Sequence, residues 1–394
     1  MQHSKLASNP GPASTLDSDT DLSRREMFAQ IKALCKPNNT SIWGVLVGEY
    51  ALLAVIIMGC TSFYHYSQTE GYSLGWAVAV YAISVGLIGG WVQNRLSCLV
   101  HEASHYSICR NRVLNDIVAN LLITFPFFGV INNYRIGHWG HHRHVNNPDK
   151  DPDLHRLKSH HPRNFPVPKW RFWWEYVVLQ TLPHKVYSYL KGRALYVVRR
   201  MKNSNVPDQD ALGSKTVTAM RVCYYGVLIL VLWLTNWWAG YALFWMIPMI
   251  TFYPVALFLR EIAHHGNYPD NGDFTNSRVY EGYWLEREIF FPFSERNHIL
   301  HHMFPTIPWH KMVEAHEVMM KYPPYRDNVV ICDGFFFKAT SNRQNPTVLD
   351  VLAAPSRHYL RGEAAPTDQT EIRRSNSDQV GAIAVDCDRL AGES

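Results

Sequence analysis

The residues of this chain whose type and spacing could support chemistry are its histidines. Eight of them fall in three short blocks, HEASH at 101–105, HWGHH at 138–142 and HILHH at 298–302. They are His101, His105, His138, His141, His142, His298, His301 and His302. Neighbours within each block lie at spacings that include three and four residues, which place side chains on one face of a helix. Since neutral imidazole binds iron, copper, zinc and nickel, and eight such ligands exceed what one ion holds, the pattern predicts two metal ions in one site.

Carboxylates are scarce beside these blocks. Soluble di-iron proteins built as helical bundles use Glu and Glu-x-x-His ligands, whereas here we find only Glu102 and Glu261 next to the histidines. Imidazole should therefore dominate the metal ligands. We expect Glu102 to form a salt bridge or to accept a hydrogen bond from a ligand histidine, which would fix the ring. Asp151 and Asp153 are expected to cap or orient local structure rather than to bind metal.

Four apolar segments must position the histidines, although a mean hydropathy of −0.18 hides them. They run over about 42–64, 74–92, 219–238 and 239–259. Each approaches the ~20 residues that cross a hydrocarbon core, so we predict four transmembrane helices in two hairpins. Pro248 and Pro254 each remove a backbone donor from the fourth segment and predict a kink there. Glu49, inside the first segment, is expected to face other helices or to reach the membrane interface, with contact to substrate or a polar partner as the alternative.

The distribution of basic residues predicts the topology. The links SQTEGYS and TNWWAG within the two hairpins carry no Lys or Arg, whereas the N-terminal arm, the central loop and the C-terminal part are rich in both. The positive-inside bias then places both termini and every histidine block in the cytoplasm. His101 lies roughly nine residues beyond the second span, on the order of 14 Å along a continuing helix. The metal site should therefore lie just outside the bilayer, where an extended hydrocarbon chain could reach it.

The remaining segments have simpler interpretations. Residues 113–130 are apolar but contain Asn115, Asp116 and Pro126, so we expect a helix lying on the membrane or buried against the domain rather than a fifth span. Residues 170–200 mix aromatic and basic side chains, which suits the headgroup layer or an ordinary packing helix. We expect no cleavable signal peptide, a flexible arm over 1–40, one membrane domain over 41–340 and a flexible tail over 341–394. The seven cysteines are scattered, which favours reduced thiols. The net charge of +5 is modest and the sequence has no nucleic-acid motif, so we expect no nucleic-acid-binding role.

The three histidine blocks and the residues around them resemble those of a known protein family. Their order, the run HWGHHRHVNNPDKDPD and the run NHILHHMFP resemble the membrane fatty acid desaturase superfamily over about residues 42–320. The resemblance implies an all-α membrane protein with four transmembrane helices, interfacial helices and a cytosolic helical cap that holds two irons. It also implies a ninth ligand in the segment before the third block, which here reads REIAHHG. His265 is preferred to His264 for this role, because it is the histidine that precedes glycine. His144, His264 and Glu102 are further candidates, as extra ligands or as partners of ligands. Leu300 departs from the family, because desaturases often have Glu there.

This resemblance implies an O2-dependent desaturase that forms a C=C bond in an acyl chain or lipid-like substrate. A hydroxylase or ketolase of an alkane, carotenoid or acyl chain is the alternative on the same site. The sequence has no dinucleotide-binding glycine fingerprint, no cysteine set for an iron–sulfur cluster and no HPGG haem segment. Electrons should therefore come from an external ferredoxin or cytochrome b5. A zinc hydrolase needs only three protein ligands, and a transporter places its polar groups at the membrane midplane, so neither explains eight or nine histidines outside the bilayer.

Overall fold

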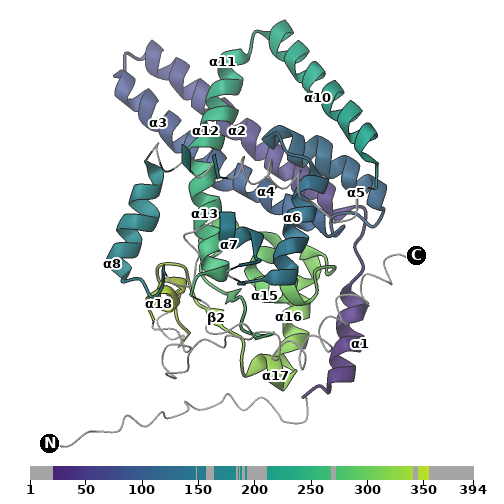
Figure 1. Ribbon diagram of the computed structural model, residues 1–394. Helices are drawn as coiled ribbons and strands as arrows, with labels where there is room; N and C mark the ends of the chain where they lie inside the picture. The colour runs from purple at the N-terminus through teal and green to yellow at the C-terminus, as the bar shows by residue number, and fades with distance from the viewer. Residues whose placement is uncertain are drawn as a thin grey trace, which may run out of the picture.

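The computed structural model describes most of the chain, and most of the described residues are helical (Figure 1). The described residues are 21–147, 149–156, 164–182, 185, 187–188, 191–192, 211–267, 272–339 and 345–354. Their strands are two short ones, β1 (Val279–Tyr280) and β2 (Ile331–Cys332), which pair in parallel with Val279 opposite Ile331. The all-α fold expected from the sequence is confirmed.

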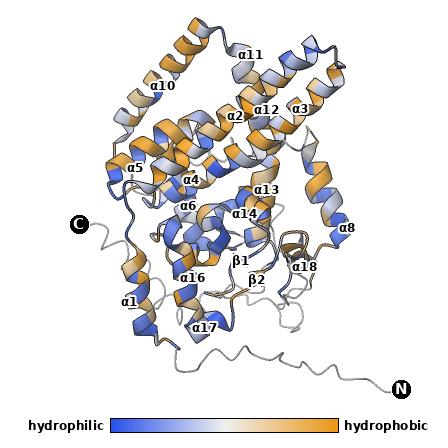
Figure 2. Ribbon diagram, turned by 180° about the vertical axis from the view of Figure 1, so that it is seen from behind, coloured by the Kyte–Doolittle hydropathy of each residue, from blue (hydrophilic) through white to orange (hydrophobic). Residues whose placement is uncertain are grey.

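Four helices are long and apolar enough to cross a membrane, as predicted. They are Ser41–Thr69 (α2), Leu74–Ser104, Ser214–Thr235 (α10) and Trp238–His265. At most 44% of any of their apolar windows is buried inside the protein, so most of these side chains face outward. Figure 2 shows the apolar colouring concentrated on these helices and the polar colouring on the cap below them. A membrane supplies the apolar surroundings that such surfaces need.

The second and fourth spans both continue into the cap. The second consists of α3 (Leu74–Leu87), the π-helical turn η2 (Ile88–Gln93) and α4 (Asn94–Ser104). The fourth consists of α11 (Trp238–Tyr241), η9 (Ala242–Met246), α12 (Ile247–Ile250) and α13 (Phe252–His265). It breaks at Thr251, between the two prolines that predicted a kink. A Cβ on Gly89 would lie 2.8 Å from the carbonyl oxygen of Pro248, so this glycine allows the two spans to touch.

The segment between the second span and the second histidine block bends by 90°. Its first arm contains α5 (Arg112–Val118), η3 (Ala119–Thr124) and η4 (Phe125–Phe127), and its second arm is α6 (Ile131–His144). By length and composition alone the bent pair could count as a fifth span. Val118, Ala119 and Ile123 are buried in a core with residues of the first two spans, as expected of a segment packed against the domain. Its location on the membrane surface stays a prediction.

Short helices build the cap around the histidine blocks. They are α7 (Pro152–Arg156), α8 (Lys169–Phe172), η7 (Trp173–Val178), η8 (Leu179–Thr181), α14 (Trp284–Phe290), η10 (Phe293–Asn297), α15 (His298–Met303), η11 (Trp309–Lys311), α16 (Met312–Met320), α17 (Pro323–Arg326) and α18 (Val348–Ala353). One apolar core lies under α8 and α18, and a second lies between α15 and α16. These cores hold the third block against the ends of the spans.

The predicted N-terminal arm over 1–40 is not uniform. Its residues Arg24–Leu34 form α1, whose N-terminus is closed by a capping box between Ser23 and Glu26. Met27 and Ile31 are buried in the same core as α16, so this part of the arm is docked on the cap. The predicted flexible tail over 341–394 also contains a packed helix, since α18 buries Val348, Leu349 and Leu352 in the core. Residues 1–20, 341–344 and 355–394 of these two segments lie outside the described residues.

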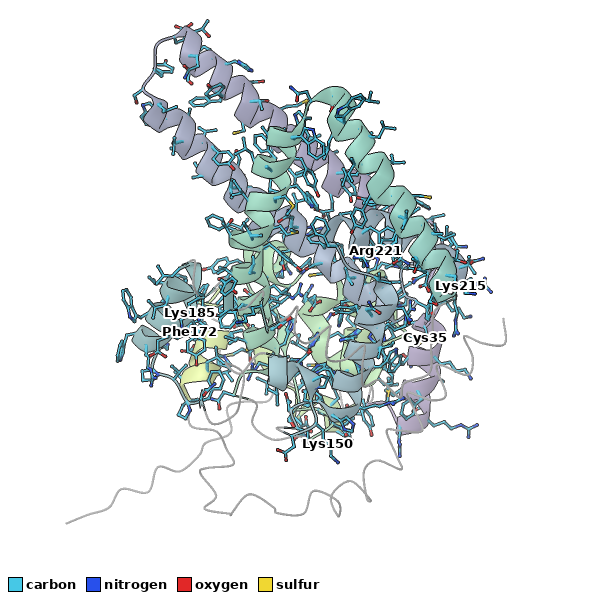
Figure 3. All side chains as sticks on the ribbon, turned by 45° about the horizontal axis from the view of Figure 1, so that its top comes forward. Cys35, Lys150, Phe172, Lys185, Lys215 and Arg221 are labelled. Carbon is cyan, nitrogen blue, oxygen red and sulfur yellow. The ribbon has the colours of Figure 1, made fainter. Side chains whose placement is uncertain are left out.

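Basic side chains lie at the cap end of the third span. Lys215 and Arg221 sit near the start of α10, where the chain leaves the cap, and Lys150 lies within the cap itself (Figure 3). The opposite end of the same hairpin, at 236–237, is Asn-Trp. The basic residues labelled on this span therefore lie at its cap end.

Candidate metal centre

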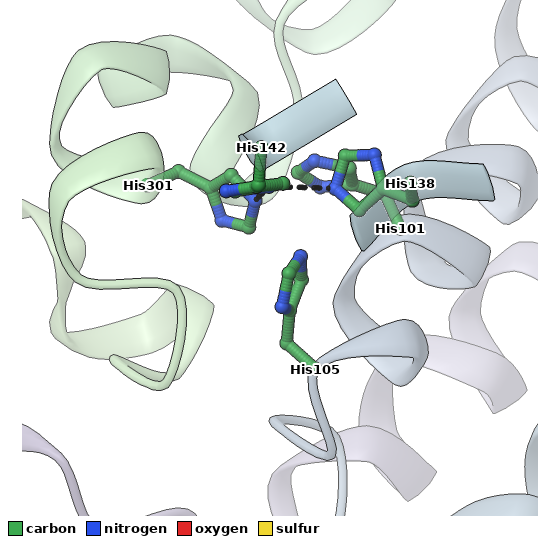
Figure 4. Close-up of side chains that lie close together, drawn as sticks. All are labelled: His101, His105, His138, His142 and His301. Carbon is green, nitrogen blue, oxygen red and sulfur yellow. Dashed lines mark hydrogen bonds between the residues drawn. The ribbon is translucent and has the colours of Figure 1, made fainter. Parts of the chain in front are cut away.

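Five histidines from three parts of the chain converge in one buried group (Figure 4). They are His101, His105, His138, His142 and His301, and one potential ligand atom from each lies within 4.8 Å of the others. The end of α4 supplies the first two, α6 supplies the next two, and α15 supplies the last. The Nε2 atom of His142 lies 2.9 Å from that of His138 and 3.2 Å from that of His301.

A second group of four histidines lies beside the first. It consists of His141, His265, His298 and His302, again with ligand atoms within 4.8 Å of one another. The Nε2 atom of His298 lies 3.0 Å from that of His265 and 3.2 Å from that of His302. The nine histidines that the sequence and the resemblance suggested as ligands are thus all brought together, five in one group and four in the other.

Each pair of adjacent histidines is divided between the two groups. In α6, His141 belongs to the group of four and His142 to the group of five, and in α15 His302 and His301 divide in the same way. Consecutive residues on a helix point about 100° apart, so a His-His pair can face two neighbouring points in space. The rings of His142 and His302 are 4.5 Å apart between centroids, so the two groups are adjacent. This geometry matches the two metal ions that the ligand count predicted.

The chemistry of the rings fits metal ions. Neither ring nitrogen of His105 has a hydrogen-bond partner among the described residues, and the ring is buried. Burial, followed by the charge of Arg135, lowers the pKa of His105 to about 3. Burial, followed by neighbouring imidazoles, also holds the pKa values of His298 and His301 well below the usual range. Neutral rings whose nitrogens point at one another are the form that binds a metal, and a bound cation would satisfy them.

His264 and His265 occupy different positions at the end of α13. His265 belongs to the group of four, whereas His264 forms a separate group with Glu295 and His298. The ring of His264 stacks on that of His298 at 3.9 Å between centroids, and its Nε2 lies 3.0 Å from the carbonyl oxygen of Glu295. This arrangement supports His265 over His264 as the ninth ligand. His144, the other spare candidate, is in none of the three groups that the described residues form.

Carboxylates contact the outer nitrogens of several rings. Both carboxylate oxygens of Asp151 lie 3.0 Å from Nδ1 of His141, which agrees with the orienting role expected of this aspartate. Glu102 lies 3.6 Å from Nδ1 of His101 and accepts hydrogen bonds from Ser107 and Ser294. In both cases the contact leaves Nε2 to face the other rings.

Glu295 is a third carboxylate at the histidines, and the sequence analysis did not predict it. Contrary to the expectation that only Glu102 and Glu261 adjoin the histidines, Glu295 is buried among them and contacts His101, His264 and His298. Its position three residues before His298 was the available signal, because this spacing brings side chains together on a helical turn.

Two buried arginines hold the ends of helices that carry histidines. Arg135 of α6 donates to the carbonyl oxygen of Ser104 at 3.0 Å, at the end of α4, and pairs with Asp116 at 2.6 Å. Arg278 donates to the carbonyl oxygens of Ala263, Gly266 and Asn267 at the end of α13. Both arginines satisfy carbonyls that a helix leaves without internal partners.

Two further buried polar side chains have defined partners. The carboxylate of Glu49 accepts from Arg95 at 2.5 Å, and Arg95 also pairs with Glu288. His316 is buried, with Nδ1 3.0 Å from the hydroxyl of Tyr325. Burial, followed by the charge of Arg296, lowers the pKa of His316 to about 4.

The chain is similar to several characterised or named proteins. It is 25% identical to the dihydrorhizobitoxine desaturase of Bradyrhizobium elkanii over 357 residues, which cover 86% of this chain and 92% of that one. It is 24% identical to a probable fatty acid desaturase of Sorghum bicolor over 237 residues, 55% of this chain and 58% of that one. A shorter match of 57 residues is 39% identical to beta-carotene 4-ketolase 3 of Haematococcus lacustris and covers 14% and 18% of the two chains.

A family profile gives the broadest assignment. The profile described as fatty acid desaturase matches residues 74–333, a range that begins with the second span and includes all three histidine blocks. This range is more than half of the 394 residues. The chain therefore belongs to the fatty acid desaturase family.

Proposed function

We propose that this protein is a di-iron, O2-dependent membrane desaturase that introduces a C=C bond into an acyl chain or lipid-like substrate. The observation that carries the proposal is the pair of adjacent, buried groups of five and four imidazoles in a chain of the desaturase family. Two irons, when bound, would supply the O2 activation needed to oxidise an unactivated C–H bond. The nine ligands would be His101, His105, His138, His141, His142, His265, His298, His301 and His302.

The chain's own task is to hold the rings, exclude water and place one carbon beside them. Most of the nine rings are less than a tenth exposed, so bulk water has little access. The rings lie at the cap ends of the second and fourth spans, where a chain leaving the bilayer could arrive. We propose that the cap is cytoplasmic and that residues 41–340 form the catalytic unit.

The electrons would come from an external ferredoxin or cytochrome b5. In desaturation the substrate gives up two hydrogens, the donor gives two electrons together with two protons from solution, and one O2 becomes two waters. In hydroxylation one oxygen atom enters the substrate instead. The local similarity to a carotenoid ketolase keeps this second reaction open as an alternative.

Expression of the chain with iron and an electron donor, beside a His301→Ala variant, tests the proposal. His65→Ala is a matched control, because His65 is exposed in the first span and belongs to neither group. Mass spectrometry of total lipids and small metabolites, including dihydrorhizobitoxine because of the relative that acts on it, should show a product that lacks two hydrogens. The wild type and His65→Ala should form it and His301→Ala should not. A product that gains oxygen would favour the hydroxylase, and identical profiles for all three would contradict the proposal.

A further inference from the structure

Glu295 is placed between the two groups of histidines. One carboxylate oxygen, Oε1, lies 3.5 Å from Nδ1 of His101, which belongs to the group of five. The other, Oε2, lies 3.6 Å from Nδ1 of His298, which belongs to the group of four. Oε2 also lies 3.4 Å from Nδ1 of His264. A single side chain therefore faces a candidate ligand of each metal site.

The contact is made on the side of each ring that faces away from its group. The Nε2 atom of His298 points at His265 and His302, at 3.0 and 3.2 Å, so its Nδ1 is left for the carboxylate. His101 presents Nδ1 to both Glu102 and Glu295. A carboxylate has two oxygens with about four acceptor positions, so it can serve rings on both sides at once.

The local sequence explains how Glu295 reaches this place. It lies in η10, immediately before α15, and is three residues from His298. Its side chain is 3% exposed, and the described cation nearest to it is Arg260, 3.9 Å from Oε2. A buried carboxylate is costly unless cations or hydrogen-bond donors surround it. The surrounding imidazoles and Arg260 therefore have to offset the free energy that burial of this carboxylate costs.

Other carboxylates contact the ligand histidines of one group each. Asp151 contacts His141 of the group of four, and Glu102 contacts His101 of the group of five. Glu295 differs from these two because it contacts both groups. Substitutions of Glu102 or Asp151 can therefore serve as comparisons for substitutions of Glu295.

We propose that Glu295 is a positioning residue that joins the two metal sites, orienting His101 and His298 through its carboxylate contacts of 3.5 and 3.6 Å with their Nδ1 atoms, which have no hydrogen-bond partner among the described residues. This inference rests on the proposed di-iron function. A carboxylate in this position fixes the tautomer, so that Nε2 carries the free electron pair, and makes the ring a stronger ligand. Because one side chain serves both rings, its loss weakens both sites together.

The test measures iron binding rather than turnover. Wild type, Glu295→Gln, Glu295→Asp and Glu102→Gln are purified from cells grown on ⁵⁷Fe, with Glu317→Gln, an exposed position on α16, as the matched surface control. The Mössbauer signals of the two ferrous sites are recorded, together with the rate at which a chelator extracts each iron. Loss of a partner of this kind costs about 10–100-fold in metal affinity.

We expect Glu295→Gln to change the signals of both irons and to increase the release of both by about 10–100-fold. Glu102→Gln should change one iron, Glu295→Asp should restore part of the wild-type behaviour, and Glu317→Gln should match the wild type. A Glu295→Gln protein with one altered iron or none would overturn the inference. So would iron-free Glu295 variants that lose helical circular dichroism, because the role would then be in folding. A folded wild-type protein that binds no iron would instead contradict the proposed function.

Discussion

Replacing Arg135 by Met should destabilise the protein more than any surface substitution. Arg135 and Asp116 form an ion pair in which both side chains are 0% exposed. Arg135 also donates to the carbonyl oxygen of Ser104. Removing one partner of a buried ion pair costs about 3–5 kcal/mol, because the other charge stays buried without compensation. At the typical unfolding entropy per residue of globular proteins, this loss lowers the Tm of a chain of this size by roughly 4–6 °C.

The effect should also reach the metal centre. Arg135 lies on the helix that carries His138 and His142, and it holds the end of the helix that carries His101. The substitution therefore loosens the position of the first block relative to the second. We expect the Arg135→Met protein to retain less iron per chain than the wild type after purification.

Thermal unfolding in detergent, followed by far-UV circular dichroism, measures the effect, with Arg25→Met on the exposed face of α1 as control. The control should stay within about 0.5 kcal/mol of the wild type. The double variant Arg135→Met/Asp116→Leu should be more stable than Arg135→Met alone, because it removes the buried charge as well. A single variant that melts within about 1 °C of the wild type, or a double variant that is less stable than the single one, would refute the reasoning.

Three further substitutions probe other parts of the structure. Asp151→Asn should weaken iron binding by about 10–100-fold, since His141 loses its anionic partner; chelator titration that finds unchanged affinity would contradict this. Gly266→Ala should displace the end of α13 and lower both Tm and iron content, because a Cβ there would lie 2.6 Å from the carbonyl oxygen of Ile262; wild-type values for both would be the contrary result. His316→Gln should make the free energy of unfolding less sensitive to acid. The pKa of His316 is about 4 in the folded protein and about 6.5 in the unfolded chain, so acid protonates the unfolded chain first. The wild type therefore keeps its full stability above about pH 6.5 and loses about 2 kcal/mol of it by about pH 5. Equal losses of Tm between about pH 7 and about pH 5 in wild type and variant would argue against it.

The sequence predicted the features of the fold that depend on local pattern. The four apolar segments became the four candidate spans, and His101 lies on a helix that continues from the second span, as expected. The three histidine blocks predicted their own convergence, because their spacing is a local signal and metal chemistry supplies a reason for them to meet. The division of each His-His pair between two groups also follows from helical geometry, once two ions are assumed.

The parts that were not predicted depend on contacts between distant residues. Arg135 and Asp116 are 19 positions apart, and Arg278 reaches a carbonyl 15 positions away. Neither residue has a neighbour in the sequence that indicates burial, and an arginine is usually exposed. Glu295 did have a local signal, its spacing from His298, but a search restricted to immediate neighbours of the blocks could not recognise it.

The helix ends explain why the centre can be both dry and favourable for cations. Candidate ligand histidines lie in the last turns of α4, α6, α13 and α15, so four helices direct their C-terminal ends toward the two groups. The C-terminal end of a helix carries a partial negative charge, which favours a nearby cation. The carbonyls at such an end normally require water, but Arg135 and Arg278 satisfy several of them from within the protein. The buried arginines therefore reduce the need for water at the helix ends that face the two groups, which suits the proposed oxidation of an apolar chain.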